Sequence, residues 1–127
     1  MKYEEKKLKL INFINNEIHI ENLFYVLENK FRSYCIIIEK DKIIYASDKF
    51  NNVENKHLDT ILPTTITKRK YIKLNNSLDL EGNIFINNFK VDLKKYFVIF
   101  KYNKRYIDYE IMLAFFNKIK HYISNEL

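Results

Sequence analysis

The segment YCIIIEKDKIIYAS, residues 34–47, decides the fold. It opens with an unbroken apolar run rich in β-branched residues, breaks at the polar residues 40–42, and continues with a second run that ends in Ala46 and Ser47. Two such runs around a short polar break predict a β-hairpin. The break contains no glycine, which two-residue hairpin loops favour, so we expect a looser loop or a type I turn with a bulge.

Two amphipathic helices are predicted before the hairpin. The first, over residues 4–16, repeats apolar residues at helical spacing. The second, over residues 20–31, repeats them at steps of three and four, with charged residues between them. Both patterns are typical of a helix with one apolar face. The N-terminal part of the chain, residues 4–31, is therefore expected to be helical.

A third helix is predicted in the segment that follows the hairpin. Asn51 and Asn52 belong to the residue types that cap helix N-termini. The apolar residues from Val53 to Leu62 supply a side to bury, and Pro63 is expected to end the helix. This helix would carry the chain across one face of the sheet.

The sequence predicts three further strands, over residues 70–74, 83–91 and 95–102. Turn-forming residues at 75–77 and 81–82 separate the first two, and residues 92–94 form a tight return before the last. The segment 34–102 is therefore expected to hold the whole sheet together with its crossover.

The order of the strands follows from which of them are apolar throughout. Residues 34–38 and 96–100 are continuous apolar runs, whereas residues 71–74 alternate. Continuous runs are typical of strands covered on both faces, and alternating strands lie nearer an edge. The first and last strands are thus expected to be neighbours at the centre. We predict an α+β fold in which a single domain, residues 1–127, contains a five-stranded antiparallel sheet of order 2-1-5-4-3 with flanking helices.

A long closing helix is predicted over residues 106–124, with two adjacent apolar stripes. One stripe is Tyr109, Met112, Phe116, Ile119 and Ile123, and the other is Ile111, Phe115 and Tyr122. One stripe can pack on the domain while the other packs on a second copy of the chain. The predicted homodimer interface consists of Leu8, Ile11, Ile14, Tyr109, Met112, Phe116, Ile119 and Ile123. The alternative is a thick intramolecular core.

The element order and the sheet order resemble the PAS/GAF, or profilin-like, architecture. The two helices followed by the hairpin of residues 35–47 further resemble the N-terminal sensory domain of PucR/CdaR-type bacterial transcription regulators. The hairpin turn of that family usually carries Asp and Gly; Asp41 fits, and Lys42 or its neighbours stand where Gly is usual. The resemblance implies a domain that senses a small molecule and relays the signal to a helix-turn-helix further along the polypeptide.

The roadblock/longin group is a competing resemblance. Its order of one helix, two strands, one helix, three strands and one helix is nearly the same. This resemblance implies a dimerising platform for protein interactions that does not sense metabolites.

Composition restricts the compartment and the partners. No apolar run approaches the roughly 18 residues that a membrane span needs, and the N-terminus shows no signal-peptide pattern. The single cysteine agrees with a reducing compartment, so a cytoplasmic protein without membrane contact is expected. The net charge is +6, but Lys outnumbers Arg 19 to 3, and Arg is the residue that binds phosphate with two parallel hydrogen bonds.

No catalytic, metal or cofactor motif is present. Cys35 lies in a predicted central strand, where a buried structural role is expected. His19, His57 and His121 are far apart and lack metal-ligand spacing. The only glycine is Gly82, which excludes a glycine-rich phosphate loop. We expect neither catalysis nor a cofactor.

The densest basic cluster is Lys68, Arg69 and Lys70, with Lys73 beyond it. Such a cluster can hold an anion, and aromatic residues nearby, such as Tyr71, suit single-stranded nucleic acid. A solvated loop entering an edge strand explains the same pattern. A small nucleic-acid-binding protein is therefore the third functional hypothesis, after the sensory domain and the interaction platform.

The leading hypothesis is a non-catalytic, dimerising sensory domain, with DNA contacted only through another domain. Its small-molecule ligand is expected between one sheet face and the crossover of residues 51–66. The expected wall residues are Tyr45, Leu58, Leu62, Ile72, Phe85 and Phe97. Ligand binding is expected to shift the packing of the closing helix.

Overall fold

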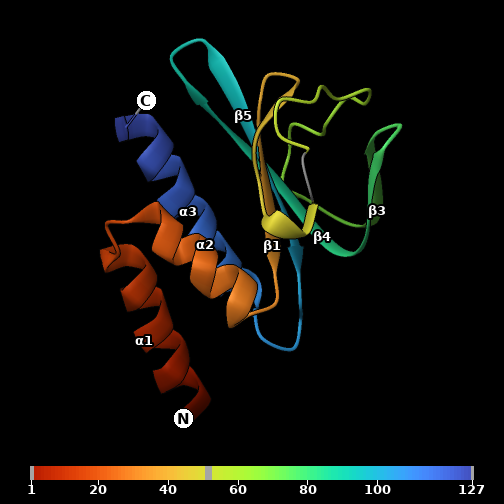
Figure 1. Ribbon diagram of the computed structural model, residues 1–127. Helices are drawn as coiled ribbons and strands as arrows, with labels where there is room; N and C mark the ends of the chain where they lie inside the picture. Colours follow the sequence, from red (N-terminus) through yellow and green to blue (C-terminus); the bar gives the residue numbers. More distant parts are fainter. Residues whose placement is uncertain (1, 51–52, 127) are drawn as a thin grey trace.

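The computed structural model describes residues 2–50 and 53–126. Its strands are β1 (Tyr34–Glu39), β2 (Lys42–Ala46), β3 (Thr67–Asn75), β4 (Leu78–Val91) and β5 (Lys94–Tyr102). They form one five-stranded antiparallel sheet of order β2-β1-β5-β4-β3. The helices cover one face of this sheet and an irregular crossover covers the other (Figure 1). The predicted α+β fold and strand order are confirmed.

The central pair β1 and β5 is apolar on both faces because both faces are covered. In the register of this pair, Ile37 lies opposite Val98 and Ile36 opposite Ile99. Ile37 and Val98 belong to the core beneath the helices, whereas Ile36 and Ile99 belong to the core beneath the crossover. Successive side chains of a strand point to opposite faces, so a strand between two cores needs apolar residues at every position.

Three helices form two layers on one face of the sheet: α1 (Lys2–Asn16), α2 (Ile20–Asn29) and α3 (Tyr109–Glu126). Contacts join α2 and α3 to the sheet, and α1 packs outside them against α3 (Figure 1). The α3 helix begins later than predicted because the Asp108 carboxylate caps it, accepting a hydrogen bond from Ile111 N at 3.0 Å. Lys7 of α1 binds the same carboxylate at 2.7 Å.

The predicted crossover helix is wrong. Residues 53–66 form turns and bends, and the predicted caps Asn51 and Asn52 lie outside the described residues. The backbone instead hydrogen-bonds to both edges of the sheet: Ile43 N in β2 donates to Lys56 O at 2.9 Å, and Asp59 N donates to Leu74 O in β3 at 2.8 Å. These bonds occupy backbone N–H and C=O groups that would otherwise bond to one another within a helix. The crossover thus links the two opposite edge strands.

The hairpin turn is tighter than predicted. Glu39 pairs with Lys42, which leaves the two-residue turn Lys40–Asp41, and Lys40 adopts a φ of 59°. The irregularity lies further along, where the pairing shifts between Ile37 and Ile38. Lys40 therefore takes the left-handed position of the turn that glycine usually occupies.

The predicted break at residues 81–82 is also wrong, because β4 runs through it. Gly82 has a φ of 118°, and the pairing of β3 with β4 shifts between Arg69 and Tyr71 opposite it. A positive φ of this size strains any other residue, so the only glycine lets the strand bend while continuing. The hairpin of β3 and β4 is therefore longer than the sequence pattern indicated.

Candidate functional site: an apolar groove and a basic basin

The structure does not bring the six predicted pocket residues together. Leu58, Leu62, Ile72 and Phe97 lie in or against the core beneath the crossover, but Tyr45 and Phe85 lie on the opposite face, beneath the helices. Phe85 pairs with Phe100 in β5, and this register sends both rings toward the helices. The predicted pocket is therefore wrong for Tyr45 and Phe85, because side-chain direction depends on a register that the sequence pattern leaves open.

The centre of the face beneath the crossover is filled by its own side chains. Leu62, Ile72, Ile86 and Ile99 are all buried there. At the start of the crossover, a hollow of about 510 Å³ is lined by Ala46, Ser47, Asp48, Phe50, Val53, Glu54 and Asn55. None of the six predicted pocket residues lines this hollow.

An apolar groove opens on the other face, where α2 and α3 meet the β1–β2 hairpin. We call it the interlayer groove. It has a volume of about 300 Å³ and is lined by Ile20, Glu21, Phe24, Ile37, Ile44, Tyr45, Ile119, Tyr122 and Ile123. Most of these side chains are apolar, and two carry a hydroxyl. This is the composition of pockets that take small, largely apolar ligands.

Tyr45 lies at the centre of the groove wall. Its ring stacks on Phe24, with 4.2 Å between centroids. Burial, and next the charge of Glu28, raise the pKa of Tyr45 above its ordinary value. Tyr45 is thus a neutral phenol whose ring lines the groove, whereas Ser47 and Glu28, which act on its hydroxyl, lie outside the groove lining.

A second concave region lies at the end of the sheet where β1 begins and β5 ends. We call it the basic basin; it has a volume of about 400 Å³, and its cations are Arg32, Lys49 and Lys101. Lys101 lies opposite Tyr34 in the register of β1 and β5, and Lys49 Nζ lies 4.5 Å from the centre of the Tyr34 ring. The chain therefore brings together three cations from separate elements.

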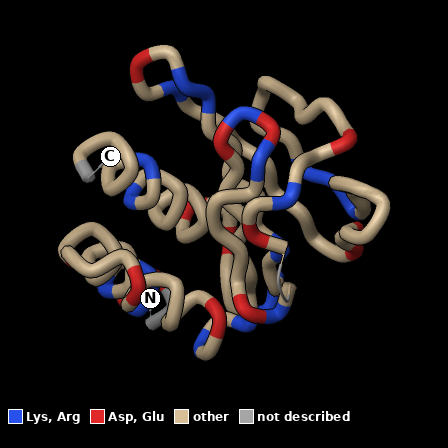
Figure 2. The backbone as a smooth tube through the Cα atoms, turned by 45° about the horizontal axis from the view of Figure 1, so that its top comes forward, with Lys and Arg blue, Asp and Glu red and all other residues tan. Residues whose placement is uncertain are grey.

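The cluster at residues 68–70 does not form a single patch. Lys68 lies opposite Phe85 on the helix face and places Nζ 4.8 Å from the centre of the Tyr109 ring. Arg69 lies opposite Ile84, whose side chain points to the other face. Figure 2 shows Lys and Arg positions spread over both ends of the sheet and over the helices. The predicted cluster is therefore divided between the two faces of the sheet.

Comparison with known protein families, with curated proteins and with solved structures finds no match for this chain. The resemblance to PucR/CdaR-type sensory domains therefore stays a prediction. The site has to be interpreted from its own geometry.

Most of the predicted dimer interface is used inside the single chain. Ile14, Met112, Phe116, Ile119 and Ile123 are buried in the core that α1, α3 and the sheet share. Most of both stripes of α3 is covered, because Phe116 of one stripe contacts Phe89 of β4 and Phe115 of the other contacts Phe31 just after α2. The intramolecular alternative accounts for these covered side chains. These five side chains are not available to a second copy.

The rest of the predicted interface remains accessible. Leu8 and Tyr109 are exposed, and Ile11 is half-buried. Lys7 joins the first turns of α1 to Asp108, just before α3, so these accessible residues belong to neighbouring segments. Of the predicted interface residues, only these three are therefore accessible to a second copy of the chain.

Two candidates for chemistry lie within residues 2–50 and 53–126: the Cys35 thiol and the His, Cys, Asp and Glu side chains that could bind a metal ion. Cys35 is buried, and burial raises the pKa of its thiol well above the ordinary value, which suppresses the thiolate. No three His, Cys, Asp or Glu side chains of these residues gather where they could hold a metal ion. Among the same residues, no helix has both the length and the apolar character needed to cross a membrane.

Of the residues that line the groove, the sequence predicted only Tyr45 as a pocket wall, and it placed Ile119 and Ile123 in the dimer interface. No local pattern distinguishes Ile20, Phe24 and Ile44 from ordinary core positions. Arg32 and Lys101 of the basin are isolated cations without a motif. Ile44 and Tyr45 are both half-buried, which strict strand alternation does not produce, but this burial is visible only in the structure.

Proposed function

We propose that the protein is a non-catalytic sensory domain that binds a small, largely apolar molecule in the interlayer groove and passes the signal through α3. The supporting observation is the origin of the groove walls. They come from α2, from the β1–β2 hairpin and, through Ile119 and Ile123, from α3. A ligand there contacts all three elements, so it favours the arrangement of α3 in which those contacts are complete.

The groove restricts the class of ligand. Its volume of about 300 Å³ is at the lower end of the range for small-molecule sites. Among the lining residues, Tyr122 carries a hydroxyl group and Glu21 a carboxylate. An aromatic or alicyclic molecule with one or two hydrogen-bonding groups fits this lining better than a sugar acid does, because a sugar acid would lose most of its hydration.

A thermal-shift screen tests this proposal. The library contains purines, aromatic amino acids, small aromatic alcohols and, as a polar comparison, sugar acids. A ligand at about 100 times its Kd stabilises the folded state by about 2.7 kcal/mol, which raises Tm by several degrees. The expected result is stabilisation by aromatic compounds and none by sugar acids. If no compound stabilises the protein, the sensory proposal fails and a roadblock-like interaction platform becomes the better account.

The proposal includes a cytoplasmic homodimer that contacts DNA only through another domain. The accessible residues Leu8, Ile11 and Tyr109 are the ones left for the dimer contact. Light scattering coupled to size-exclusion chromatography at tens of micromolar is expected to show a dimer, and Leu8→Glu is expected to shift it toward monomer. Lys9→Glu, at an exposed neighbouring position, is the matched control. A wild-type monomer at this concentration contradicts the dimer proposal.

A further inference from the structure

We infer that the basic basin is a second ligand site, separate from the interlayer groove, and that it binds the phosphate group of a small phosphorylated molecule. The first reason is the convergence of charge. Arg32 comes from the turn between α2 and β1, Lys49 from the short helical turn Asp48–Phe50, and Lys101 from β5. These positions are far apart in the sequence, and the fold places all three around one hollow of about 400 Å³.

The second reason is that this charge is poorly compensated. Among the described residues, Arg32, Lys49 and Lys101 have no carboxylate within 4.0 Å, and no carboxylate lines the basin. Glu28 and Asp48 line the adjoining hollow beside Arg32 and Lys49 and offset part of the charge. The Glu28 carboxylate already accepts a hydrogen bond from Asp48 N at 3.3 Å. A bound anion would relieve the remaining repulsion.

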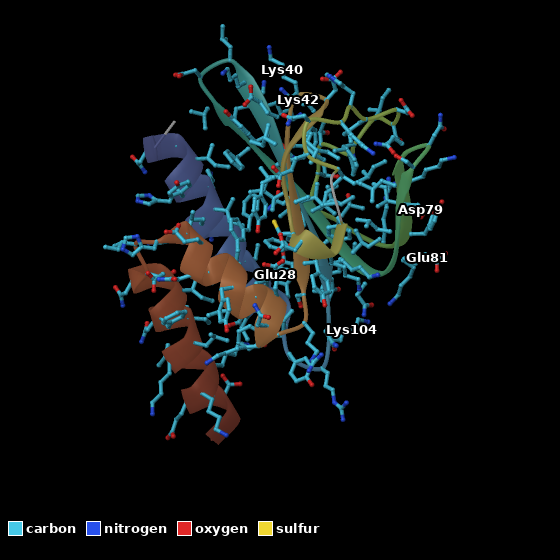
Figure 3. All side chains as sticks on the ribbon, in the orientation of Figure 1. Glu28, Lys40, Lys42, Asp79, Glu81 and Lys104 are labelled. Atoms are coloured by element: carbon cyan, nitrogen blue, oxygen red, sulfur yellow. The ribbon has the colours of Figure 1, made fainter. Side chains whose placement is uncertain are left out.

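Further positive charge borders the basin. Lys70 donates a hydrogen bond to the Asn83 side-chain oxygen, and Asn83 lines the basin. The neighbouring positive charge of Lys104 lowers the pKa of Lys70. Figure 3 shows Lys104 at this end of the sheet, opposite the end that carries Lys40 and Lys42. Positive charge therefore predominates around the basin, although Glu28 and Asp48 offset part of it on one side.

The basin is also held in shape before any ligand binds. Ser33 is buried beside Arg32; its hydroxyl accepts a hydrogen bond from Asn103 N at 3.0 Å and donates one to Phe31 O at 2.9 Å. These bonds fix the turn that carries Arg32 to the end of β5, and Arg32 itself adopts a φ of 48°. A site whose groups are already positioned loses less entropy on binding.

The chemistry of the donors indicates phosphate. The Arg32 guanidinium can make two parallel hydrogen bonds to neighbouring phosphate oxygens, and Lys49 and Lys101 supply point charges. The Asn83 amide nitrogen remains as a further donor, because its oxygen is used by Lys70. The volume exceeds what one phosphate needs, which leaves room for the group that the phosphate is attached to. A small phosphorylated molecule therefore fits better than a bare anion.

Nuclear magnetic resonance titrations of the whole 15N-labelled chain test the inference, with pyrophosphate, AMP and a ten-nucleotide thymidine strand as separate probes at about 0.15 M salt. Saturable shifts of the Gly82, Asn83 and Asn103 amides with pyrophosphate and AMP are expected.

Three substitutions remove the cations of the basin one at a time. Arg32→Asn is chosen because Asn tolerates the positive φ of this position, and Lys49→Gln and Lys101→Met keep most of each side chain. Each is expected to raise the Kd about tenfold, whereas Lys120→Gln on the exposed face of α3 leaves it unchanged.

Three results would overturn the inference. They are the absence of saturable shifts, an equal loss of affinity in Lys120→Gln, and tighter binding of the thymidine strand than of AMP, which favours a nucleic-acid site. The pyrophosphate titration does not depend on the interlayer groove, because pyrophosphate has no aromatic group and its expected shifts lie at residues of the basin. The two proposals therefore fail or succeed separately.

Discussion

The ring of Phe24 in α2 stacks on the ring of Tyr45 in β2, with centroids 4.2 Å apart and planes inclined by 16°. This pair joins the helical layer to the edge of the sheet and forms one wall of the interlayer groove. Phe24 is 8% exposed, whereas Tyr45 is half-buried at the groove. Stability and ligand binding are therefore expected to depend on the same contact.

Phe24→Ala is expected to lower the free energy of unfolding by about 3 kcal/mol or more, because it removes a buried ring and leaves Tyr45 without its partner. Phe24→Leu keeps most of the apolar volume and is expected to cost about 1 kcal/mol. Urea denaturation monitored by circular dichroism measures both. Equal effects of the two substitutions would mean that the stacked geometry contributes nothing.

Ile44→Phe is expected to fill part of the groove and to abolish the thermal shift that aromatic ligands produce in the wild type. Ile66→Phe adds the same atoms at a position that is 50% exposed and outside the groove lining, and it is expected to keep the shift. Phosphate binding at the basic basin is expected to survive in both variants. If Ile44→Phe still responds to the ligand, the ligand binds somewhere other than the groove.

Ser47→Ala is expected to destabilise the protein by about 1–3 kcal/mol. The buried Ser47 hydroxyl accepts a hydrogen bond from Cys35 N at 2.8 Å and donates one to Cys35 O at 3.3 Å. Its removal leaves the Cys35 amide without this acceptor in an apolar surrounding. Ser124→Ala, at an exposed position, is the control and is expected to change stability little. Similar unfolding midpoints for the two variants would contradict this role.

The stabilisation that the ion pairs of Lys7 give to the docking of α1 is expected to be lost at alkaline pH. The hydrogen bond to Asp108 raises the pKa of Lys7, burial opposes it, and Glu110 adds to the increase. Because the folded pKa lies above the unfolded value of about 10.4, the stabilisation is complete below that value. It is lost as the pH rises through the folded pKa.

The measurement is the difference in unfolding free energy between the wild type and Lys7→Met, taken at neutral pH and at strongly alkaline pH. The difference is expected to shrink at alkaline pH, while Lys9→Met, at an exposed position of the same helix, shows little difference at either pH. A Lys7→Met difference that stays constant with pH would assign the contribution of Lys7 to packing of its apolar stem.

The Cys35 thiol is expected to react with a disulfide reagent only when the chain unfolds. The residue is 0% exposed, and burial raises the pKa of its thiol, so the folded protein presents little thiolate. Labelling in native buffer is expected to be slow, because it depends on the small population of unfolded chains, and to rise steeply in urea. Rapid labelling without denaturant would show that β1 opens locally.

The sequence by itself determined the sheet and its order. Residues 34–38 and 96–100 are apolar at every position, and only a strand covered on both faces keeps that composition, so the pairing of β1 with β5 follows from local pattern. The helices before and after the sheet follow from spacing in the same way. These features depend on residues close together in the chain, whose periodicity is visible without a structure.

The tertiary structure decided the crossover, the pocket and the basin. Residues 53–66 stay irregular because their backbone groups bind β2 and β3, two edges that no local pattern brings together. Phe85 turns from the expected pocket to the helices because of its register with Phe100. Arg32, Lys49 and Lys101 lie close together because the turn before β1, the helical turn after β2 and the end of β5 are all at the same end of the sheet. Long-range pairing and register set these positions, and neither is encoded in local periodicity.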